Sequence, residues 1–394
     1  MNILFLDQTG KLGGAQLSLL DIAKPYRSSC LIALMEDGPF RSRLEANAIP
    51  VEVISDREIQ VTQQSGLVRG LKSVPNLLTM AKTVAHMSKS YDVIYANTQK
   101  ALIVGAIASV WSGKPLVFHL HDILTKEHFS LVNRKISVTF ANRFASLVIA
   151  DSEATKAAYL AAGGRSEITE TVYYGFEIEP YLDIMPKPEQ VRAEVGLSDK
   201  FIVGHFSRLS PWKGQHVLIE ALQYCPESVV AMFVGDALFG ENEYVARLHQ
   251  QVETLGLQNR VTFLGFRSDV SQLMAACDLV AHTSTSAEPF GRVIVEAMLC
   301  DRPVVAAADG GAVEIVTHGK TGWSTTPGDA LKLASVINEC VSDPFASAAI
   351  AHAGHLEAID RFHIDKTMRE IDRLLAQVMK PRDQSSSKLV NSQS

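Results

Sequence analysis

The chain has 394 residues, of which 47% are hydrophobic and 20% charged, and this length suits two domains with separate cores. The formal net charge of −6 argues against general nucleic-acid binding, and the five scattered cysteines indicate neither a zinc site nor a disulfide framework. No apolar run approaches the roughly 20 residues of a membrane-spanning helix. Residues 1–6 lead directly into a strand pattern without a cationic leader, so we expect a cytoplasmic protein.

A short apolar run at residues 2–7 (NILFLD) is typical of a strand that is buried on both faces of a parallel sheet. Further strands, alternating with helical stretches, are predicted at residues 31–35, 51–54, 93–96, 116–121 and 147–150. This alternation predicts a doubly wound α/β domain, in which ligands bind outside the carboxyl ends of the strands. The helix after residue 150 is expected to be capped by Ser152.

A glycine-rich loop at residues 9–15 separates the first strand from the first helix and contains the pair Gly13 and Gly14. A loop of this kind at a helix N-terminus is a candidate for phosphate binding. The spacing is not G-x-G-x-x-G, so a dinucleotide site is only weakly supported, and a simple tight turn is the alternative.

The segment 61–100 is amphipathic, with five basic residues against one acid. It would suit either weak contact with an anionic membrane surface or a solvated helix face beside an apolar core. Pro75 interrupts the helical periodicity, which favours the solvated face.

The run FHLHD at residues 118–122 ends a predicted strand. His119 and His121 would point to the same side of that strand, as metal ligands do. No companion cluster with ligand spacing follows in the sequence, so a metal site is not expected. His121 is interpreted either as a ligand-binding residue at the strand end or as a hydrogen-bonded loop histidine.

Residues 178–194 contain three prolines and are interpreted as a linker to a second α/β domain at residues 195–361. Strands are predicted there at residues 201–206, 229–235, 261–266 and 303–307, and Ser268 is expected to cap the helix after the third. Arg208 and Lys213 bracket a turn after the first of these strands. A guanidinium fork and a compact ammonium could neutralise a diphosphate from two directions, and two unrelated surface charges are the alternative.

The stretch 281–301 carries two glutamates, Glu288 and Glu296, on either side of a predicted helix start near Gly291. The first N–H groups of that helix would be free to bind a phosphate, and Gly291 would let the backbone approach it. Glu296 would then be near a ribose, and Glu288 would face the group beyond the phosphates. The alternative is an ordinary strand–loop–helix connection with two solvated glutamates.

The sequence EPFGRVIVE at residues 288–296 resembles the E-x7-E motif of retaining glycosyltransferases of family four, which have the GT-B fold of two Rossmann-like domains facing across a cleft. Arg208 and Lys213 resemble the Arg-x4-Lys pair that binds the pyrophosphate in that family. The resemblance implies that Gly13 and Gly14 lie against the donor phosphates and that His121 lies beside the transferred sugar. The expected donor-binding residues are Gly13, Gly14, Phe266, Arg267, Phe290, Gly291, Arg292, Val293 and Glu296. The chain departs from the family at Tyr174, where asparagine usually precedes the glycine.

The resemblance therefore predicts domains at residues 1–177 and 195–361, with a last helix at 362–379 that returns to the first domain and a disordered tail at 381–394. It implies a retaining, metal-independent transfer of a hexosyl group from a nucleotide-sugar, by default a UDP-sugar such as UDP-glucose, with no cofactor. A carbohydrate or lipid-linked acceptor in polysaccharide or glycoconjugate synthesis is expected. Arg208, Lys213, Glu288 and His121 would carry the reaction, with Glu288 either orienting the donor or acting as a nucleophile. The alternatives are a nucleotide-sugar 2-epimerase and a binding subunit without turnover.

Overall fold

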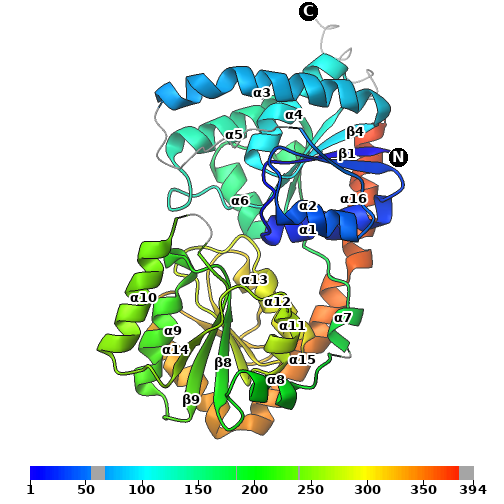
Figure 1. Cartoon of the computed structure of the whole chain (residues 1–394). Coiled ribbons are helices and arrows are strands. Elements are labelled where there is room, and N and C mark those ends of the chain that lie inside the picture. The colour runs from blue at the N-terminus through cyan, green and yellow to red at the C-terminus, as the bar shows by residue number, and fades with distance from the viewer. Residues whose placement is uncertain (55–66, 183, 238–239, 381–394) are drawn as a thin grey trace, which may run out of the picture.

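The structure, a computed structural model, describes residues 1–54, 67–182, 184–237 and 240–380. Two parallel sheets lie one above the other (Figure 1). The first has the strand order β3-β2-β1-β4-β5-β6-β7 and the second the order β10-β9-β8-β11-β12-β13. The predicted pair of doubly wound α/β domains is thus confirmed.

The first sheet is built from short strands, and the inner ones are almost completely buried, as parallel strands covered by helices on both faces must be. Its strands are β1 (Ile3–Asp7), β2 (Cys30–Leu34), β3 (Val51–Val53), β4 (Val93–Ala96), β5 (Leu116–Leu120), β6 (Ala145–Ala150) and β7 (Thr169–Thr171). Its helices are α1 (Gly14–Ala23), α2 (Pro39–Ala46), α3 (Leu67–Met87), α4 (Gln99–Ser112), α5 (Leu131–Phe144) and α6 (Glu153–Ala161).

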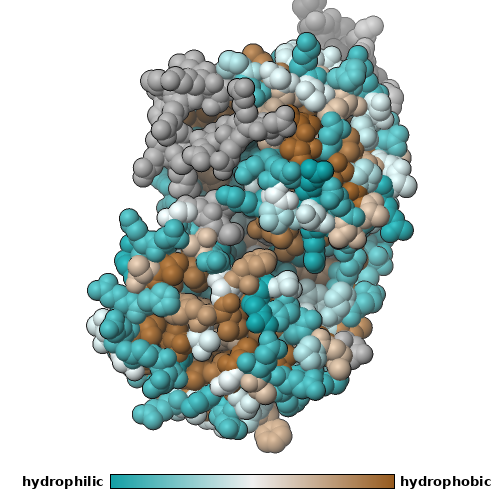
Figure 2. All heavy atoms as spheres, viewed as in Figure 1, coloured by the Kyte–Doolittle hydropathy of each residue, from teal (hydrophilic) through white to brown (hydrophobic). Residues whose placement is uncertain are grey.

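The second sheet follows the same plan. Its strands are β8 (Phe201–Phe206), β9 (Val229–Val234), β10 (Val261–Phe263), β11 (Leu279–His282), β12 (Val304–Ala307) and β13 (Trp323–Thr325). Its helices are α9 (Gln215–Ala221), α10 (Asn242–Thr254), α11 (Val270–Ala275), α12 (Arg292–Leu299), α13 (Ala312–Ile315), α14 (Ala330–Ser342) and α15 (Pro344–Phe362). In the space-filling view hydrophilic side chains surround both units, and hydrophobic ones lie in the middle of the lower unit's visible face (Figure 2).

The last helix, α16 (Ile364–Met379), lies against the first sheet (Figure 1). Its buried side chains share a core with β1, namely Met368, Ile371, Leu374 and Leu375. His363 separates α15 from α16, so the helix starts later than the sequence predicted. At this break the amide of Phe176 donates to the carbonyl of Phe362 and the amide of Ile364 to the carbonyl of Phe176. The two crossings between the sheets therefore run side by side.

The segment 178–194, predicted as a linker, contains the helices α7 (Glu179–Leu182) and α8 (Pro188–Glu194), because proline is compatible with a first helical turn. Several other local expectations were wrong. Helix α3 continues through Pro75. Ser268 is not the cap of α11, since Asp269 holds that position. The strand predicted to reach residue 266 ends at Phe263, and the short strands β7, β11 and β13 were not predicted. The tail 381–394 lies outside the described residues.

Candidate functional site

The carboxyl ends of the two sheets face each other, and loops from both sides make contact there. The Nε2 of His128 in the first unit is 3.0 Å from the carbonyl oxygen of Ala287 in the second. Ser152 caps α6, as predicted, and its hydroxyl also donates to the carbonyl of Pro289. The carboxylate of Glu314 accepts hydrogen bonds from the amides of Glu153 and Ala154 at the start of α6, at 3.0 and 2.8 Å. The two edges thus form one interface beside Glu288.

Glu288 is buried at this interface and is held by three donors. Its Oε2 lies 2.7 Å from the Nζ of Lys213, 3.1 Å from the Nε2 of His282 and 3.0 Å from the Oγ of Ser284. Burial raises the pKa of Glu288, but Lys213 and His282 outweigh burial and hold the pKa well below the ordinary 4.5. The carboxylate is therefore ionised at neutral pH.

His282 and Ser284 were not singled out from the sequence. They alternate at the carboxyl end of β11, the place where side chains of a parallel sheet face ligands, and that position was the available signal. The strand itself was not predicted.

Arg208 and Lys213 lie on either side of a turn and both contact the ring of Trp212. The Cζ of Arg208 is 5.8 Å from the ring centroid and the Nζ of Lys213 is 4.0 Å from it. An indole face attracts both cations, so it holds them in one site. His128 packs edge-on against the same ring with centroids 5.2 Å apart, which brings the first unit to this position.

Helix α12 begins where the sequence predicted, with Gly291 as its N-cap in a left-handed conformation (φ 106°) and without a side-chain cap. The left-handed φ favours glycine at this position. A Cβ at Gly291 would also lie 2.8 Å from the Cδ1 of Ile294. Gly310 and Gly311 pack directly against this loop. A Cβ at either position would collide with the backbone of residues 288–290. The free amides of α12 suit an anionic group.

Phe290 was expected to bind the donor, but its side chain is in the core. It is 1% exposed and packs on Tyr174 with ring centroids 4.8 Å apart. Val293 is also partly buried, against the same hydrophobic cluster. These side chains shape the loop, and only their backbone could reach a ligand.

Arg292 was likewise expected at the donor and instead joins the two units. Its Nη2 is 3.3 Å from the Oδ2 of Asp21 on α1, and its Nε is 3.4 Å from the Oε1 of Glu296. Burial raises the pKa of Glu296, and Arg292 opposes that effect. Within the described structure Nη1 of Arg292 is buried without a hydrogen-bond partner, so this atom is left for an anion.

The glycine pair Gly13 and Gly14 lies beside α12. Gly13 is the N-cap of α1 without a side-chain cap, and a Cβ on Gly14 would be 3.5 Å from the Cδ of Arg292. The start of α1 therefore lies beside the Arg292 side chain of α12 across the interface, and its free amides suit an anionic group.

His121 lies at the end of β5, and both of its ring nitrogens are hydrogen-bonded. Nδ1 is 2.6 Å from the hydroxyl of Tyr174, and Nε2 is 2.7 Å from the Oδ1 of Asn97. The rings of His119 and His121 lie on the same side, 3.9 Å apart, and His119 is bonded to Tyr95. His121 is therefore a hydrogen-bonded histidine, and it lies at the carboxyl edge of the sheet, where ligands of parallel sheets bind.

Phe266 and Arg267 lie beyond the carboxyl end of β10. Phe266 is 65% exposed, whereas Arg267 is paired with Asp269 at 2.6 Å and with Glu194 at 3.2 Å. An open aromatic ring could stack on a nucleobase, and the paired guanidinium is held beside it.

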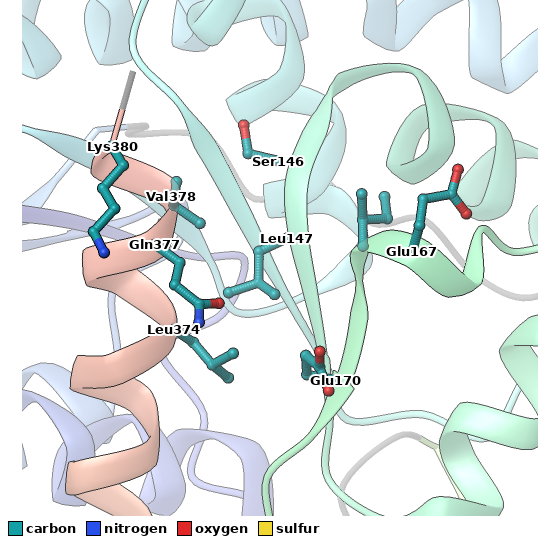
Figure 3. A pocket seen from close by; sticks show the side chains of 9 residues that line it. Ser146, Leu147, Glu167, Glu170, Leu374, Gln377, Val378 and Lys380 are labelled. Carbon is teal, nitrogen blue, oxygen red and sulfur yellow. The ribbon is translucent and has the colours of Figure 1, made fainter. Parts of the chain in front are cut away.

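The described residues include no group of three or more His, Cys, Asp or Glu side chains placed to hold a metal. None of their helices is both long enough and apolar enough to span a membrane. A pocket of about 160 Å³ lies between α16 and the strands β6 and β7 (Figure 3). Ser146 and Leu147 place it near the amino end of β6, at the edge opposite the interface.

Two family models match the chain, the glycosyl transferase 4-like domain over residues 13–175 and glycosyl transferases group 1 over residues 187–355. The crystal structure of Anabaena Alr3699/HepE in complex with UDP-glucose is 53% identical, covers 96% of this chain and 100% of that one, and has a TM-score of 0.89.

Two curated relatives match shorter stretches. Spore coat protein SA of Bacillus subtilis is 35% identical over 170 residues, which are 39% of this chain and 44% of that protein. The GDP-mannose-dependent alpha-(1-6)-phosphatidylinositol monomannoside mannosyltransferase of Mycolicibacterium smegmatis is 28% identical over 233 residues, 57% of this chain and 58% of that protein. The chain spans about half the length of these curated relatives.

Proposed function

Because this chain belongs to the group 1 glycosyl transferases and has the GT-B fold, we propose that it transfers a hexosyl group from a nucleotide-sugar to an acceptor hydroxyl. The observation that carries the proposal is the Lys213–Glu288 pair, placed with Arg208 where the two sheets face each other. A UDP-sugar is the favoured donor, since the relative that is 53% identical was crystallised with UDP-glucose. A GDP-sugar is the competing donor, because a relative at 28% identity is named as GDP-mannose-dependent.

The leaving nucleoside diphosphate is the group that this site is built to stabilise. When the sugar departs, negative charge develops on the β-phosphate. Arg208, Lys213 and the free amides of α12 are preorganised around that position, so they stabilise the charge as it forms. Trp212 holds both cations in place before the donor binds.

Glu288 orients the donor in this proposal. Three donors converge on one of its oxygens and its pKa is low, so the carboxylate is a stable anion suited to accept hydrogen bonds from sugar hydroxyls. Retention of configuration then follows from attack on the face that the nucleotide leaves. Mass-spectrometric detection of a glycosyl group bound to Glu288 would replace this role with that of a nucleophile.

The acceptor is proposed to be a carbohydrate or a lipid-linked sugar, with weak contact between the first domain and a membrane. The first turn of α5 supports this contact, because it begins near the interface and exposes Leu131 and Val132 beside Lys135. Pelleting with anionic vesicles tests the contact, and the paired substitution of Leu131 and Val132 by serine should abolish it. The cytoplasmic location stays a prediction.

The decisive experiment measures nucleotide binding and transfer in EDTA. Titration calorimetry with UDP, GDP and ADP should show one tight nucleotide, and the matching nucleotide-sugar should release it only with an acceptor. Acceptor-independent change at C2 of the sugar would indicate a 2-epimerase, and binding without any release would indicate a binding subunit. Activity that returns only with added Mg²⁺ would overturn the metal-independent mechanism.

A further inference from the structure

A hydrogen-bonded chain of buried side chains runs along the carboxyl edge of the first sheet. The Nδ2 of Asn97 donates to the Oδ2 of Asp7 at 2.7 Å, and the Oδ1 of Asn97 faces the Nε2 of His121 at 2.7 Å. The hydroxyl of Tyr174 lies 2.6 Å from the Nδ1 of His121 and 3.1 Å from the Oδ2 of Asp151. These residues lie at or just beyond the carboxyl ends of five strands, and one protonation pattern with a neutral His121 satisfies all the bonds.

The pattern is set from the Asp7 end. The amide nitrogen of Asn97 also points at the carbonyl of Ala15, and both of its partners are acceptors, so its oxygen must be the atom that faces His121. The Nε2 of His121 therefore carries a proton. In a neutral imidazole Nδ1 is then an acceptor, and the single proton of the Tyr174 hydroxyl is donated to it.

The bond between Tyr174 and Asp151 must then take its proton from Asp151. The Oδ1 of Asp151 is buried and has no hydrogen-bond partner among the described residues, an arrangement that an ionised carboxylate tolerates poorly. Burial raises the pKa of Asp151 to about 7 against the lowering effect of the Thr155 and Tyr174 hydroxyls, and the carboxylates of Asp122 and Glu288 add to the rise. A neutral Asp151 that donates to Tyr174 agrees with each of these observations.

The charged and titratable groups around His121 also favour its neutral form. Burial lowers the pKa of His121 well below 6.5, and His119 and Arg292 lower it further. The guanidinium of Arg292 also lies 5.6 Å from the Tyr174 ring centroid. An imidazolium at His121 would add a second buried positive charge beside Arg292, so the site disfavours it.

We propose that Tyr174 is a positioning residue for the transfer reaction, which donates its hydroxyl proton to the Nδ1 of His121 and so holds the neutral imidazole in place, in a hydrogen bond that a protonated Asp151 directs. This inference rests on the proposed function, in which His121 lies beside the transferred sugar. The imidazole then presents a fixed, uncharged ring to that sugar. Tyr174 is the position at which the sequence departs from its family, so the arrangement concerns this chain's own residue.

The first experiment separates the effect of the Tyr174 hydroxyl from that of the Tyr174 ring. Tyr174→Phe keeps the packing on Phe290 and removes only the hydrogen bonds. In the full-length protein labelled with ¹⁵N-histidine, His121 signals are assigned by their loss in His121→Asn. The wild type should show the Nε2–H tautomer with a hydrogen-bonded Nδ1, and Tyr174→Phe should keep this tautomer but show the Nδ1 signal shifted to that of a nitrogen without a donor. Turnover should fall about tenfold, as loss of one hydrogen bond predicts, with the KM for the nucleotide-sugar unchanged.

The matched control is Tyr159→Phe, which removes a tyrosine hydroxyl bonded to Asn142 elsewhere in the first domain. It should leave the His121 Nδ1 signal and the turnover unchanged. A Tyr174→Phe protein with the wild-type Nδ1 signal would overturn the inference, and so would a wild-type His121 that carries protons on both nitrogens.

The second experiment uses Asp151→Asn, whose amide can donate to Tyr174 at every pH as the protonated acid does. Above about pH 7 the wild type should lose turnover as Asp151 ionises and the Tyr174 proton turns away from His121. Asp151→Asn should keep its turnover there, and the same alkaline loss in this variant would overturn the inference. If no donor and acceptor pair supports transfer, the proposed function fails, while the histidine spectra still decide whether Tyr174 donates to the Nδ1 of His121.

Discussion

The ammonium of Lys213 lies 2.7 Å from the Oε2 of Glu288, although the two residues are 75 positions apart in the sequence. Lys213 ends the turn after β8, and Glu288 lies on the loop before α12. The pair joins the group proposed to stabilise the diphosphate to the group proposed to orient the sugar. A change in either residue should therefore affect the binding of both the diphosphate and the sugar of the donor.

Lys213→Ala should lower turnover by roughly 10²–10³, as removal of one preorganised donor to a developing charge does in other enzymes. The pKa of Glu288 should also rise, because its closest cation is lost. Steady-state kinetics measure the first effect. Lys366→Ala is the control, since Lys366 pairs with Asp360 on the surface. Wild-type turnover by Lys213→Ala would refute the proposed role of Lys213.

Phe266→Ala should weaken nucleotide binding, with base stacking worth about 1–3 kcal/mol. The stability of the protein should hardly change, because the ring is 65% exposed. Calorimetric titration with the preferred nucleotide measures the loss. Phe345→Ala serves as the matched control, since Phe345 is 88% exposed on α15, on the second unit. Equal affinities for the two variants would exclude Phe266 as the base contact.

Arg292→Ala should destabilise the protein by about 3–5 kcal/mol, because it leaves Asp21 and Glu296 buried without their shared cation. Burial already raises the pKa of both carboxyls, so the loss should be larger at pH 8 than at pH 5, where protonation relieves it. Denaturant unfolding at the two pH values measures this difference. Arg373→Ala, which breaks an exposed pair with Glu370, should cost about 1 kcal/mol or less at both.

Asp151 should make the stability of the wild type fall as the pH rises. Its pKa is about 7 in the fold against an ordinary 3.8, so the folded state binds the proton more tightly than the unfolded state does. The stability from the neutral carboxyl is complete below about pH 4 and is lost between pH 4 and 7, by a few kcal/mol.

Asp151→Asn should lack this loss. The difference between its free energy of unfolding and that of the wild type should therefore increase from pH 4 to pH 7 and stay constant above pH 7. Asp360→Asn is a control of opposite sign, because Lys366 lowers the pKa of Asp360. Parallel stability curves for Asp151→Asn and the wild type over the whole range would show that Asp151 is ionised in the fold.

Much of the architecture was readable from local patterns. Strand β4 was predicted to the residue, and α12 starts directly after the predicted Gly291, because apolar runs and glycine or proline breaks act over a few residues. Arg208 and Lys213 were placed after a strand and Glu288 on the loop before a helix for the same reason. The strands β7 and β13 escaped prediction, because their three residues (TET and WST) form no apolar run, and β11 was missed as well.

The sequence by itself thus determined two parallel α/β domains and the loops that carry the expected chemistry. Only the tertiary structure decided which side chains meet. Arg292 pairs with Asp21 of the other unit, Phe290 enters the core, and His121 is held between Asn97 and Tyr174. These choices depend on how the facing edges of two sheets pack, and on which buried polar groups find partners there. Such long-range packing leaves no periodic signal in the chain.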